Sequence, residues 1–373
     1  MPPHEPREAT ISDPVRILVV GLGNMGRSHA LAYHRLDGFE IVGLMSRRVR
    51  STAHMLPAEL YGYPLFEDYE QALRETQPDA VSINTYTDSH AAYALRAMDG
   101  GCHVFVEKPL ATNLADAEAI VAKAKATRRK LVVGYILRLH PAWQKLVEIG
   151  RGLGKPLVMR MNLNQQSSGQ AWVWHRSLME SLTPIVDCGV HYLDVMCQLT
   201  RARPVRVHGI GAKLSSETAV QNYGHLHVVF EDGSVGWYEA GWGPMMSEVA
   251  YFVKDVWGPK GSISIVVKQD GSTEASARQV SASADIDQHT RTNALKLHHA
   301  ELDAAGNFAR ADEWLDMSDE PDHQELCERE QAWFLRTILE DIDLTRSMAD
   351  AVTSLRIVLA AQQSIDEARV VEL

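Results

Sequence analysis

The chain contains 373 residues, of which 45% are hydrophobic and 23% are charged, and its formal net charge at pH 7 is −11. A chain of this length suits about two domains, and the composition is that of an ordinary soluble globular protein. The negative charge argues against partners such as nucleic acid or an anionic membrane, because both surfaces are polyanionic.

The beginning of the chain and its cysteines together predict a cytoplasmic protein. Residues 1–14, MPPHEPREATISDP, are proline-rich and polar, so we expect a flexible leader rather than a secretory signal or a membrane anchor. No later stretch approaches the roughly 20 uninterrupted apolar residues that span a bilayer. Cys102, Cys188, Cys197 and Cys327 form no CxxC pair, which predicts neither a zinc cluster nor a disulfide framework.

From residue 16 onward, short β-branched apolar runs alternate with helical stretches of ten or more residues. The expected strands are residues 16–21, 40–46, 79–84, 103–108 and 131–136, and the expected helices include residues 25–36, 89–98 and 115–125. Near-continuous apolar strands that alternate with helices predict a parallel sheet covered on both faces. The fold class expected for this half is therefore a doubly wound α/β domain.

The first strand runs directly into GLGNMG, a GxGxxG pattern that opens a helix. Gly21 permits the tight turn, Gly23 lets the backbone approach a pyrophosphate, and Gly26 lets the helix pack closely on the strand. In this context the pattern predicts dinucleotide binding, with Asn24 and Met25 in the same cofactor loop. The alternative is a glycine turn that binds no ligand.

The second strand ends in MSRR, at the position where an acidic residue would hydrogen-bond the adenosine ribose of NAD. No carboxylate stands at this strand tip. Ser46 can instead donate to a 2′-phosphate, and Arg47 or Arg48 can stack on adenine or pair with that phosphate. The pattern therefore favours NADP over NAD. The alternative is that both arginines are solvated residues at a helix start.

Polar residues follow the next two strands, in NTYTDSH and in VFVEKP. Both segments lie at carboxyl ends of strands, the edge where ligands bind in open α/β sheets. Lys108 stands there between a carboxylate and a proline, which makes it a candidate site residue. The alternative is an ion pair with Glu107, although neighbours along a strand point to opposite faces.

The second half of the chain has its own strand pattern. Strands are expected at residues 156–165, 205–214, 225–243 and 262–267, with EDGS at 231–234 as a hairpin turn. Residues 269–321 are polar and irregular, so His298 and His299 fit loop surface better than a metal site. Helices are expected at residues 323–339 and after residue 347. A boundary near residues 138–141 divides the chain into domains at 15–138 and 139–373.

The stretch DCGVHYLD places two carboxylates and a histidine within eight residues. In a helix, Asp187 and His191 lie four apart on one face, and Asp194 lies near the same stripe. The spacing allows a metal clamp, a proton relay or an ordinary capped helix. A zinc ion would need a third ligand from elsewhere, and the chain has neither HExxH nor a cysteine pair, so we expect no metal.

Together these motifs resemble the Gfo/Idh/MocA oxidoreductases, which include glucose–fructose oxidoreductase and inositol dehydrogenase. The resemblance rests on GLGNMG, TYTDSH, EKP, GYILRLHP and DCGVHYLD in this order. It implies a Rossmann domain followed by an α/β domain with a large open, mostly antiparallel sheet. It also implies a homodimer or homotetramer formed through the open sheet face, and the apolar alternation in HLHVVF and SVGWYEAGW favours this assembly.

The resemblance also implies roles for individual residues. Lys108, Asp187 and His191 would surround the reacting carbon of a sugar or polyol beside the nicotinamide. The residues that would approach the cofactor's ribose or nicotinamide are Thr85, Glu107 and Arg138. Two departures from the family pattern concern the substrate pocket: ESLTPIVD lacks the usual glycines before the aspartate, and Tyr86 replaces a proline.

The segment QAWVWHR, just before DCGVHYLD, offers candidate substrate contacts. The aromatic faces of Trp172 and Trp174 suit the apolar side of a sugar ring, and His175 adjoins them. Arg176 can meet a carboxylate, a phosphate or a sulfonate. The alternative is that these tryptophans pack a domain interface.

The function expected from these residues is hydride transfer between NAD(P) and a secondary alcohol or ketone of a sugar, an inositol or a sugar derivative. His191 would act as the general base, Asp187 would orient it, and Lys108 would hydrogen-bond the reacting oxygen. One alternative is a glycoside-cleaving enzyme that retains its cofactor and acts by transient oxidation and elimination. Another is a non-catalytic nucleotide sensor.

Overall fold

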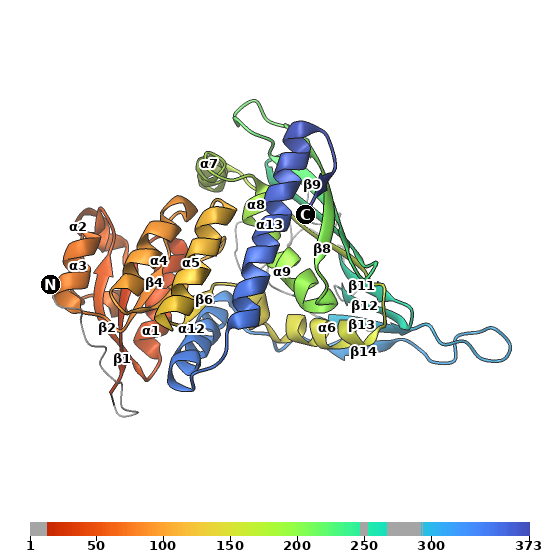
Figure 1. The fold of residues 1–373 in the computed structure, drawn as a ribbon, viewed down its shortest axis with the longest axis horizontal. Helices are drawn as coiled ribbons and strands as arrows, with labels where there is room; N and C mark the ends of the chain where they lie inside the picture. The colour runs from red at the N-terminus through yellow and green to blue at the C-terminus, as the bar shows by residue number, and fades with distance from the viewer. Residues whose placement is uncertain (1–12, 247–252, 267–291, 293) are drawn as a thin grey trace. The chain divides into compact units, whose positions relative to one another are not determined.

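The computed structural model describes residues 13–246, 253–266, 292 and 294–373, which form two compact units (Figure 1). The first unit contains the described residues up to Ile136 together with Gln324–Val352, and the second contains those of Leu137–His323 together with Thr353–Leu373. Residues 324–352, which the sequence places in the second domain, therefore belong to the first unit. Most of the expected leader lies outside the described residues.

The first unit is built on a parallel sheet of six strands in the order β3-β2-β1-β4-β5-β6. Its strands are β1 Val15–Val20, β2 Phe39–Met45, β3 Leu65–Phe66, β4 Ala80–Ile83, β5 His103–Val106 and β6 Leu131–Val133. The five expected strands are present, and β3 is an additional strand of two residues at the edge. The expected doubly wound parallel sheet is confirmed.

Helices connect these strands. They are α1 Asn24–Arg35, α2 Val49–Thr52, α3 Tyr69–Thr76, α4 His90–Asp99 and α5 Leu114–Thr127. The three expected helices begin and end within two residues of their predicted bounds. Because β-α-β crossovers are right-handed, the helices on the way from β1 to β3 and those on the way from β4 to β6 cover opposite faces of the sheet.

Helix α12, His323–Leu339, spans the residues predicted for it and packs against the first unit. The Tyr33 hydroxyl of α1 donates to Gln331 Oε1 at 2.6 Å. The ring of Phe334 lies 6.3 Å from that of Phe39 on β2 and 6.0 Å from that of Phe105 on β5. Helix α12 therefore lies beside α1 and extends the cover of the sheet from β2 to β5.

The second unit contains a nine-stranded sheet in the order β14-β13-β12-β11-β7-β10-β9-β8-β15. Only the pair β10 and β7 is parallel among its described pairings, which confirms the expected mostly antiparallel sheet. The strands are β7 Val158–Gln166, β8 Pro204–Ala212, β9 Tyr223–Phe230, β10 Val235–Gly243, β11 Lys254–Gly258, β12 Gly261–Val266, β13 Ala294–His299, β14 Glu313–Asp316 and β15 Val371–Glu372.

Some details of this unit differ from the prediction. The expected hairpin turn does join β9 to β10. Strands β13 and β14 lie within residues 269–321, so the irregular structure expected there is wrong for these two segments. The remainder of that prediction falls partly on residues 267–291 and 293, outside the described residues. Helices of this unit are α6 Pro141–Gly152, α7 Gly169–Leu178, α8 Pro184–Asp187 and α9 Gly189–Thr200.

One face of the second sheet is covered by α9 and by the end of α13, Thr345–Glu367. A Cβ atom added to Gly209 of β8 would lie 2.4 Å from the carbonyl oxygen of Ala361, so β8 and α13 approach closely. Tyr192 of α9 stacks on Tyr238 of β10 with ring centroids 5.0 Å apart. This packing fixes the helix that carries His191 against the sheet.

The core beneath α9 contains a buried lysine. Lys254 of β11 is 1% exposed, its ammonium bonds the carbonyl of Asn162, and it lies 4.8 Å from the centre of the Tyr192 ring. Burial lowers the pKa of Lys254 from 10.5 to about 7. Between pH 7 and about 10 the unfolded chain therefore binds more protons than the folded chain, so stability rises with pH in this window.

We expect this dependence to disappear in Lys254→Met. Urea unfolding at pH 7 and pH 9 measures this difference. Between these pH values the free energy of unfolding of the wild type should rise by about 2 to 3 kcal/mol more than that of the variant, since one proton corresponds to about 1.4 kcal/mol per pH unit. Lys260→Met, which changes a lysine just beyond β11, serves as the control and should leave the pH dependence as in the wild type. A difference between wild type and Lys254→Met that stays constant with pH would contradict the prediction.

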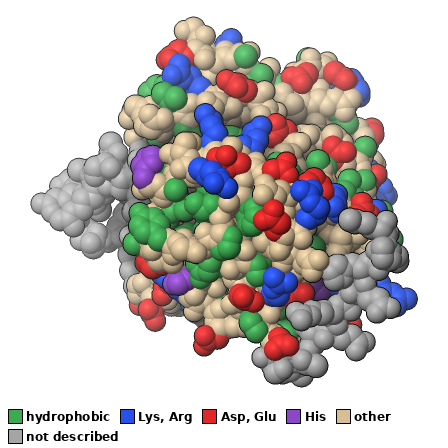
Figure 2. Space-filling view, turned by 90° about the vertical axis from the view of Figure 1, so that its left-hand side faces the viewer, with side chains coloured by type: hydrophobic (Ala, Val, Ile, Leu, Met, Phe, Trp, Pro, Cys, Tyr) green, Lys and Arg blue, Asp and Glu red, His purple; other side chains and the backbone are tan. Residues whose placement is uncertain are grey.

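Two surface properties are plain. Among the described residues, no helix is both long enough and apolar enough to cross a membrane. On the face drawn in Figure 2, acidic side chains are interspersed with basic ones. The negative charge of the chain is therefore not gathered into a single patch on that face.

Candidate active site

The glycine turn of the first unit has the shape that a phosphate needs. Gly21 has φ +85°, and a Cβ atom on Gly26 would lie 1.8 Å from the carbonyl oxygen of Gly21, so neither position accepts a side chain. Around a Cβ atom on Gly23, by contrast, the described residues leave more than 4 Å of open space. Gly23 and Asn24 are exposed at the start of α1, beside the partly buried Met25.

The start of α1 is also electrostatically suited to an anion. No side chain among the described residues caps it, and its first turn contains no acidic residue. The positive end of the helix dipole and its first N–H groups attract a phosphate. The residues present therefore fit a bound dinucleotide.

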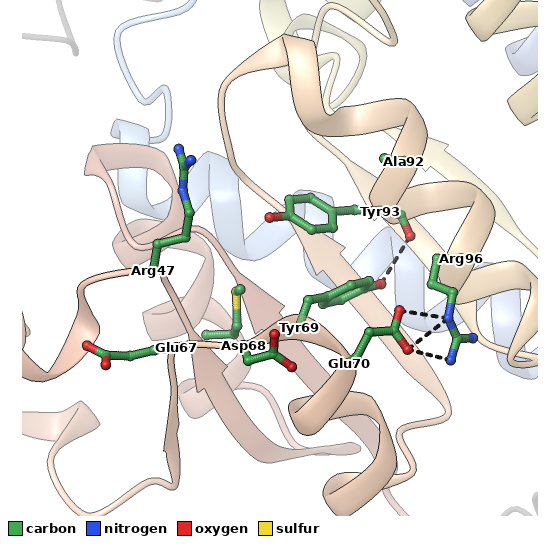
Figure 3. A pocket seen from close by; sticks show the side chains of 9 residues that line it. Arg47, Glu67, Asp68, Tyr69, Glu70, Ala92, Tyr93 and Arg96 are labelled. Atoms are coloured by element: carbon green, nitrogen blue, oxygen red, sulfur yellow. Dashed lines mark hydrogen bonds and ion pairs between the residues drawn. The ribbon is translucent and has the colours of Figure 1, made fainter.

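A cavity of about 400 Å³ lies beside the carboxyl ends of β2 and β3 (Figure 3). Its lining residues are Met45, Arg47, Glu67, Asp68, Tyr69, Glu70, Ala92, Tyr93 and Arg96. Arg47 and Glu67 rise on one side, while Tyr93 and Arg96 stand on the other. Of the three residues predicted at this strand tip, Arg47 lines the cavity and Arg48 does not, and Ser46 is tied to β3 by its N–H, which donates to the carbonyl of Phe66.

The acidic residues of this cavity were not predicted. Glu70 is paired with Arg96, whose guanidinium donates to it at 2.8 Å, and Asp68 accepts from the N–H of Gln71 at the start of α3. Glu67 faces the same space. A sequence signal was available, because EDYE directly follows β3, but a strand of two residues is too short to recognise from its pattern.

The loops after β4 and β5 are joined by a buried histidine. One ring nitrogen of His90 lies 2.8 Å from the carbonyl oxygen of Pro109, and the other lies 3.0 Å from that of Thr85. The Thr85 hydroxyl in turn bonds that of Ser89 at 2.7 Å. Burial lowers the pKa of His90, although the two carbonyl contacts oppose this effect. The structure thus brings Thr85 and the EKP segment to one edge of the sheet.

Glu107 contacts Lys108 through the backbone of the lysine. Glu107 is 7% exposed, and its carboxylate accepts from the Lys108 backbone N–H at 3.0 Å. Its other oxygen lies 2.7 Å from His29 Nε2 of α1. The Glu107 side chain is therefore turned into the unit, and Lys108 is only partly buried. His29 was missed because its partner lies 78 positions away in the sequence.

In the second unit, DCGVHYLD is divided between two helices. Asp187 is the last residue of α8, Cys188 separates the helices, and His191 lies in the first turn of α9. Cys188 has helical backbone angles, so the spacing between Asp187 and His191 is close to that of one continuous helix. Both side chains are partly buried. The backbone therefore runs through both residues in a nearly continuous helical path.

Asp194 has a different environment from the other two polar residues of this stretch. It is 1% exposed, and it accepts from Arg138 Nε at 2.7 Å and from a second guanidinium nitrogen of the same arginine. Gln198 also donates to it at 3.0 Å. The guanidinium of Arg138, predicted to approach the cofactor, is therefore held by Asp194.

The four candidate substrate-binding residues of α7 differ in their exposure to solvent. Trp172 and His175 are buried, whereas Trp174 is 44% exposed. Arg176 forms an ion pair with Glu217. His175 stacks on Trp242 at 4.6 Å, and the indole N–H of Trp242 donates to Gln165. Only Trp174 therefore offers a large exposed aromatic face among these four residues.

One group of described residues has the spacing of metal ligands. His29, Cys327 and Glu330 of the first unit have ligand atoms within 4.8 Å of one another. Both ring nitrogens of His29 are already hydrogen-bonded, to Glu107 and to Gln331. The pair His298 and His299 lies on β13, where each ring bonds a carboxylate of the facing segment, Asp312 and Glu313.

Comparisons with known proteins address both units. Residues 15–135 match the family described as "Oxidoreductase family, NAD-binding Rossmann fold", and residues 142–264 match the Gfo/Idh/MocA C-terminal domain. UDP-N-acetylglucosamine 3-dehydrogenase of Acidithiobacillus ferrooxidans is 32% identical over 205 residues, which are 55% of this chain and 60% of that protein. The chain thus spans less than two thirds of that relative.

Two further proteins extend the comparison. Scyllo-inositol 2-dehydrogenase (NAD(+)) of Bacillus subtilis is 28% identical over 261 residues, covering 67% of this chain and 73% of that protein. The crystal structure of the WlbA dehydrogenase from Bordetella pertussis, in complex with NADH and UDP-GlcNAcA, is 18% identical with a TM-score of 0.72, covering 96% of this chain and 99% of the other. At that identity the likeness shows the fold alone. Because the family matches in both units together cover more than half of its length, the chain belongs to the Gfo/Idh/MocA oxidoreductase family.

Proposed function

We propose that this chain transfers a hydride between NAD(P) and a secondary alcohol or ketone of a sugar, an inositol or a sugar derivative. One observation carries the proposal: the glycine turn opens α1 with room for a pyrophosphate at Gly23, on the same sheet edge as Lys108. The relatives named as sugar and inositol dehydrogenases support the substrate class. The buried thiols of all four cysteines support a reducing, cytoplasmic location.

In this proposal each candidate residue has a separate role in the reaction. A bound nicotinamide supplies the hydride acceptor. His191 takes the proton of the substrate hydroxyl, because an imidazole accepts and releases a proton near neutrality. Asp187 orients that imidazole or holds a neighbouring hydroxyl. Lys108 donates a hydrogen bond to the reacting oxygen and stabilises its alkoxide character.

Substrate contacts centre on α7 in this proposal. Trp174, which is exposed, offers its face to the apolar side of a sugar ring. The buried Trp172 and His175 hold α7 in place instead, since His175 stacks on Trp242. Arg176 would meet an anionic group only by exchanging its partner Glu217.

A screen of polyols, aldoses, uronates and inositols with NAD and with NADP tests the proposed function. We expect at least one compound to cause net cofactor reduction, read as absorbance of the reduced nicotinamide. A glycoside-cleaving enzyme would instead release product without a net change in this absorbance. A nucleotide sensor would bind the cofactor and turn over no compound.

The cofactor preference rests on the strand tip after β2. Arg47 faces the cavity that we propose for the adenosine end, and no carboxylate stands at residues 45–48. NADP should therefore bind more tightly than NAD. Arg47→Ala should raise the KM for NADP about tenfold, because it removes one charged hydrogen bond to the 2′-phosphate. The KM for NAD should change little. Arg48→Ala is the matched control, because Arg48 does not line the cavity.

A further pair of variants tests the sign of the charge at this site. Ser46→Asp should narrow or reverse the preference, because its carboxylate repels a 2′-phosphate. Glu67→Gln should strengthen NADP binding for the same reason. Steady-state KM values for both cofactors measure these changes. A wild-type enzyme that prefers NAD at least tenfold would contradict the assignment.

Assembly through the second sheet is the remaining part of the proposal. On the face opposite α9 and α13, Ile210, Val235 and Trp257 are 49%, 37% and 42% exposed. The strand registers place them on the same side of the sheet. Covering such a face in a homodimer or homotetramer would remove this apolar surface from water.

We expect light scattering at micromolar protein to give the mass of a dimer or a tetramer. The double variant Ile210→Lys and Val235→Lys should lower this mass to that of the monomer, because it places charges in the interface. Leu214→Lys alters an exposed apolar residue just beyond the end of β8 and serves as the control. A monomeric wild type would contradict the prediction.

A further inference from the structure

A continuous chain of hydrogen bonds runs through the interior of the first unit. The Tyr33 hydroxyl donates to Gln331 Oε1 at 2.6 Å, and Gln331 Nε2 lies 2.8 Å from His29 Nδ1. His29 Nε2 lies 2.7 Å from Glu107 Oε1, and the other oxygen of Glu107 accepts from the Lys108 N–H at 3.0 Å. The chain thus joins α12 to the backbone of the candidate active-site lysine.

The partners fix the direction of each bond. Because the carbonyl oxygen of the Gln331 amide accepts from Tyr33, its NH₂ group faces His29, and an NH₂ group only donates. Nδ1 of His29 is therefore the acceptor nitrogen, and the ring proton is on Nε2. Nε2–H consequently donates to Glu107. A neutral histidine in this one tautomer satisfies both neighbours.

The titratable groups beside this chain of hydrogen bonds are consistent with donation from Tyr33 toward Gln331 and from His29 toward Glu107. Glu330 of α12 is 2% exposed, and no hydrogen-bond partner among the described residues meets its Oε2 atom. Burial and the nearby charge of Glu107 raise the pKa of Glu330 well above its ordinary value, so it is the uncharged member of the pair. Burial likewise raises the pKa of Tyr33, which keeps its hydroxyl a donor. Two further titratable neighbours are Cys327, beside His29 and Glu330, and His90, which interacts electrostatically with Glu107.

We propose that His29 is a positioning residue that acts through Glu107 on the backbone of Lys108, and that α12 returns to the first unit to lock its tautomer. The Glu107 carboxylate is held at one end by the ring of His29 and holds the Lys108 N–H at the other. The place of the lysine backbone therefore depends on a residue that does not touch the substrate. This inference rests on the proposed function for its effect on turnover, but not for its effect on structure.

A matched pair of amide substitutions tests the donor directly. In His29→Gln the side-chain amide reaches the position of Nε2 and keeps a donor toward Glu107. In His29→Asn the amide reaches only the position of Nδ1 and leaves Glu107 without that donor. We expect His29→Asn to lower kcat about 10- to 100-fold with little change in the KM for the cofactor, since a displacement of about 1 Å at a reacting group can have such an effect. His29→Gln should stay within about threefold of the wild type.

Combination with Lys108→Ala separates positioning from general destabilisation. If His29 acts through Lys108, His29→Asn should have almost no further effect on kcat in the Lys108→Ala background. A full additional loss of kcat in that background overturns the proposal. His103→Gln, which alters a histidine at the opposite end of β5, is the control and should leave kcat unchanged.

Hydrogen–deuterium exchange tests the same inference without turnover, so that a failure of the proposed function remains distinguishable. The Lys108 amide should exchange about tenfold faster in His29→Asn than in His29→Gln, the equivalent of one hydrogen bond of about 1.4 kcal/mol. Amides of β4 and β6 should keep their rates. Equal rates at Lys108 in the two variants, or faster exchange throughout the sheet in His29→Asn, would overturn the positioning role.

Discussion

We expect His191→Ala to lower kcat by about two to four orders of magnitude, the usual effect of removing a positioned acid–base group. Oxidation of an alcohol releases a proton from the hydroxyl, and His191 is the group proposed to take it. The side chain is partly buried in the first turn of α9, four positions after Asp187, the last residue of α8. Lys108→Met should have an effect of similar size, because it removes the donor to the reacting oxygen while keeping the length of the side chain.

Cofactor affinity should change little in either variant, since neither side chain belongs to the glycine turn. The measurement is kcat with the substrate found in the screen, together with cofactor binding by nicotinamide fluorescence. His208→Ala, at an exposed histidine of β8, and Lys125→Met, at an exposed lysine of α5, are the matched controls. If His191→Ala keeps a kcat near that of the wild type, the proton-relay assignment is wrong and this residue belongs to an ordinary helix surface.

The second large effect is expected on stability rather than on turnover. Asp194→Ala should lower the free energy of unfolding by about 3 to 5 kcal/mol, because it removes one partner of a buried ion pair. The pair is well formed, with Asp194 1% exposed and two guanidinium nitrogens bonded to its two oxygens. Asp194→Asn should be milder than Asp194→Ala, since the amide oxygen still accepts one hydrogen bond.

Urea unfolding at pH 7 measures these differences, and the double variant Arg138→Met with Asp194→Leu is the informative control. Removal of both charges should recover much of the stability lost in Asp194→Ala, because two apolar side chains then replace a buried ion pair. The kcat of Asp194→Asn should fall far less than that of His191→Ala. A loss below about 1 kcal/mol in Asp194→Ala would mean that the pair behaves like a surface salt bridge.

Local pattern was enough to predict five of the six strands of the first unit, its helices α1, α4 and α5, and helix α12, but not β3, α2 or α3. The apolar runs, the glycine turn and the helical periodicity are all properties of neighbouring residues. The packing of α12 on the first unit could not be predicted. It depends on contacts of Phe334 with β2 and β5, which begin some 230 to 300 positions earlier in the chain. Strand β14 was missed because it has only four residues, three of them exposed, so it lacks the alternation of a half-buried strand.

The candidate site divides in the same way. Adjacent residues, such as those of the glycine turn or Asp187 and His191, could be predicted from spacing. The partners of Arg138 and Glu107 could not, because a bond between residues 56 or 78 positions apart leaves no periodic signal. The sequence does not reveal whether a charged side chain is already paired within the protein. The structure shows that Arg138 is bonded to a carboxylate and Glu107 to a histidine ring.

Deuterium tracing measures the central claim, net hydride transfer, most directly. The alcohol identified in the screen would be labelled with deuterium at each secondary carbon in turn and incubated with the oxidised cofactor and the enzyme. We predict that label at one carbon, and at that carbon alone, appears in the isolated reduced cofactor in equal amount to the ketone formed. If product accumulates while the cofactor remains oxidised and the deuterium stays in the sugar, the chain does not carry out net oxidation and the account is contradicted.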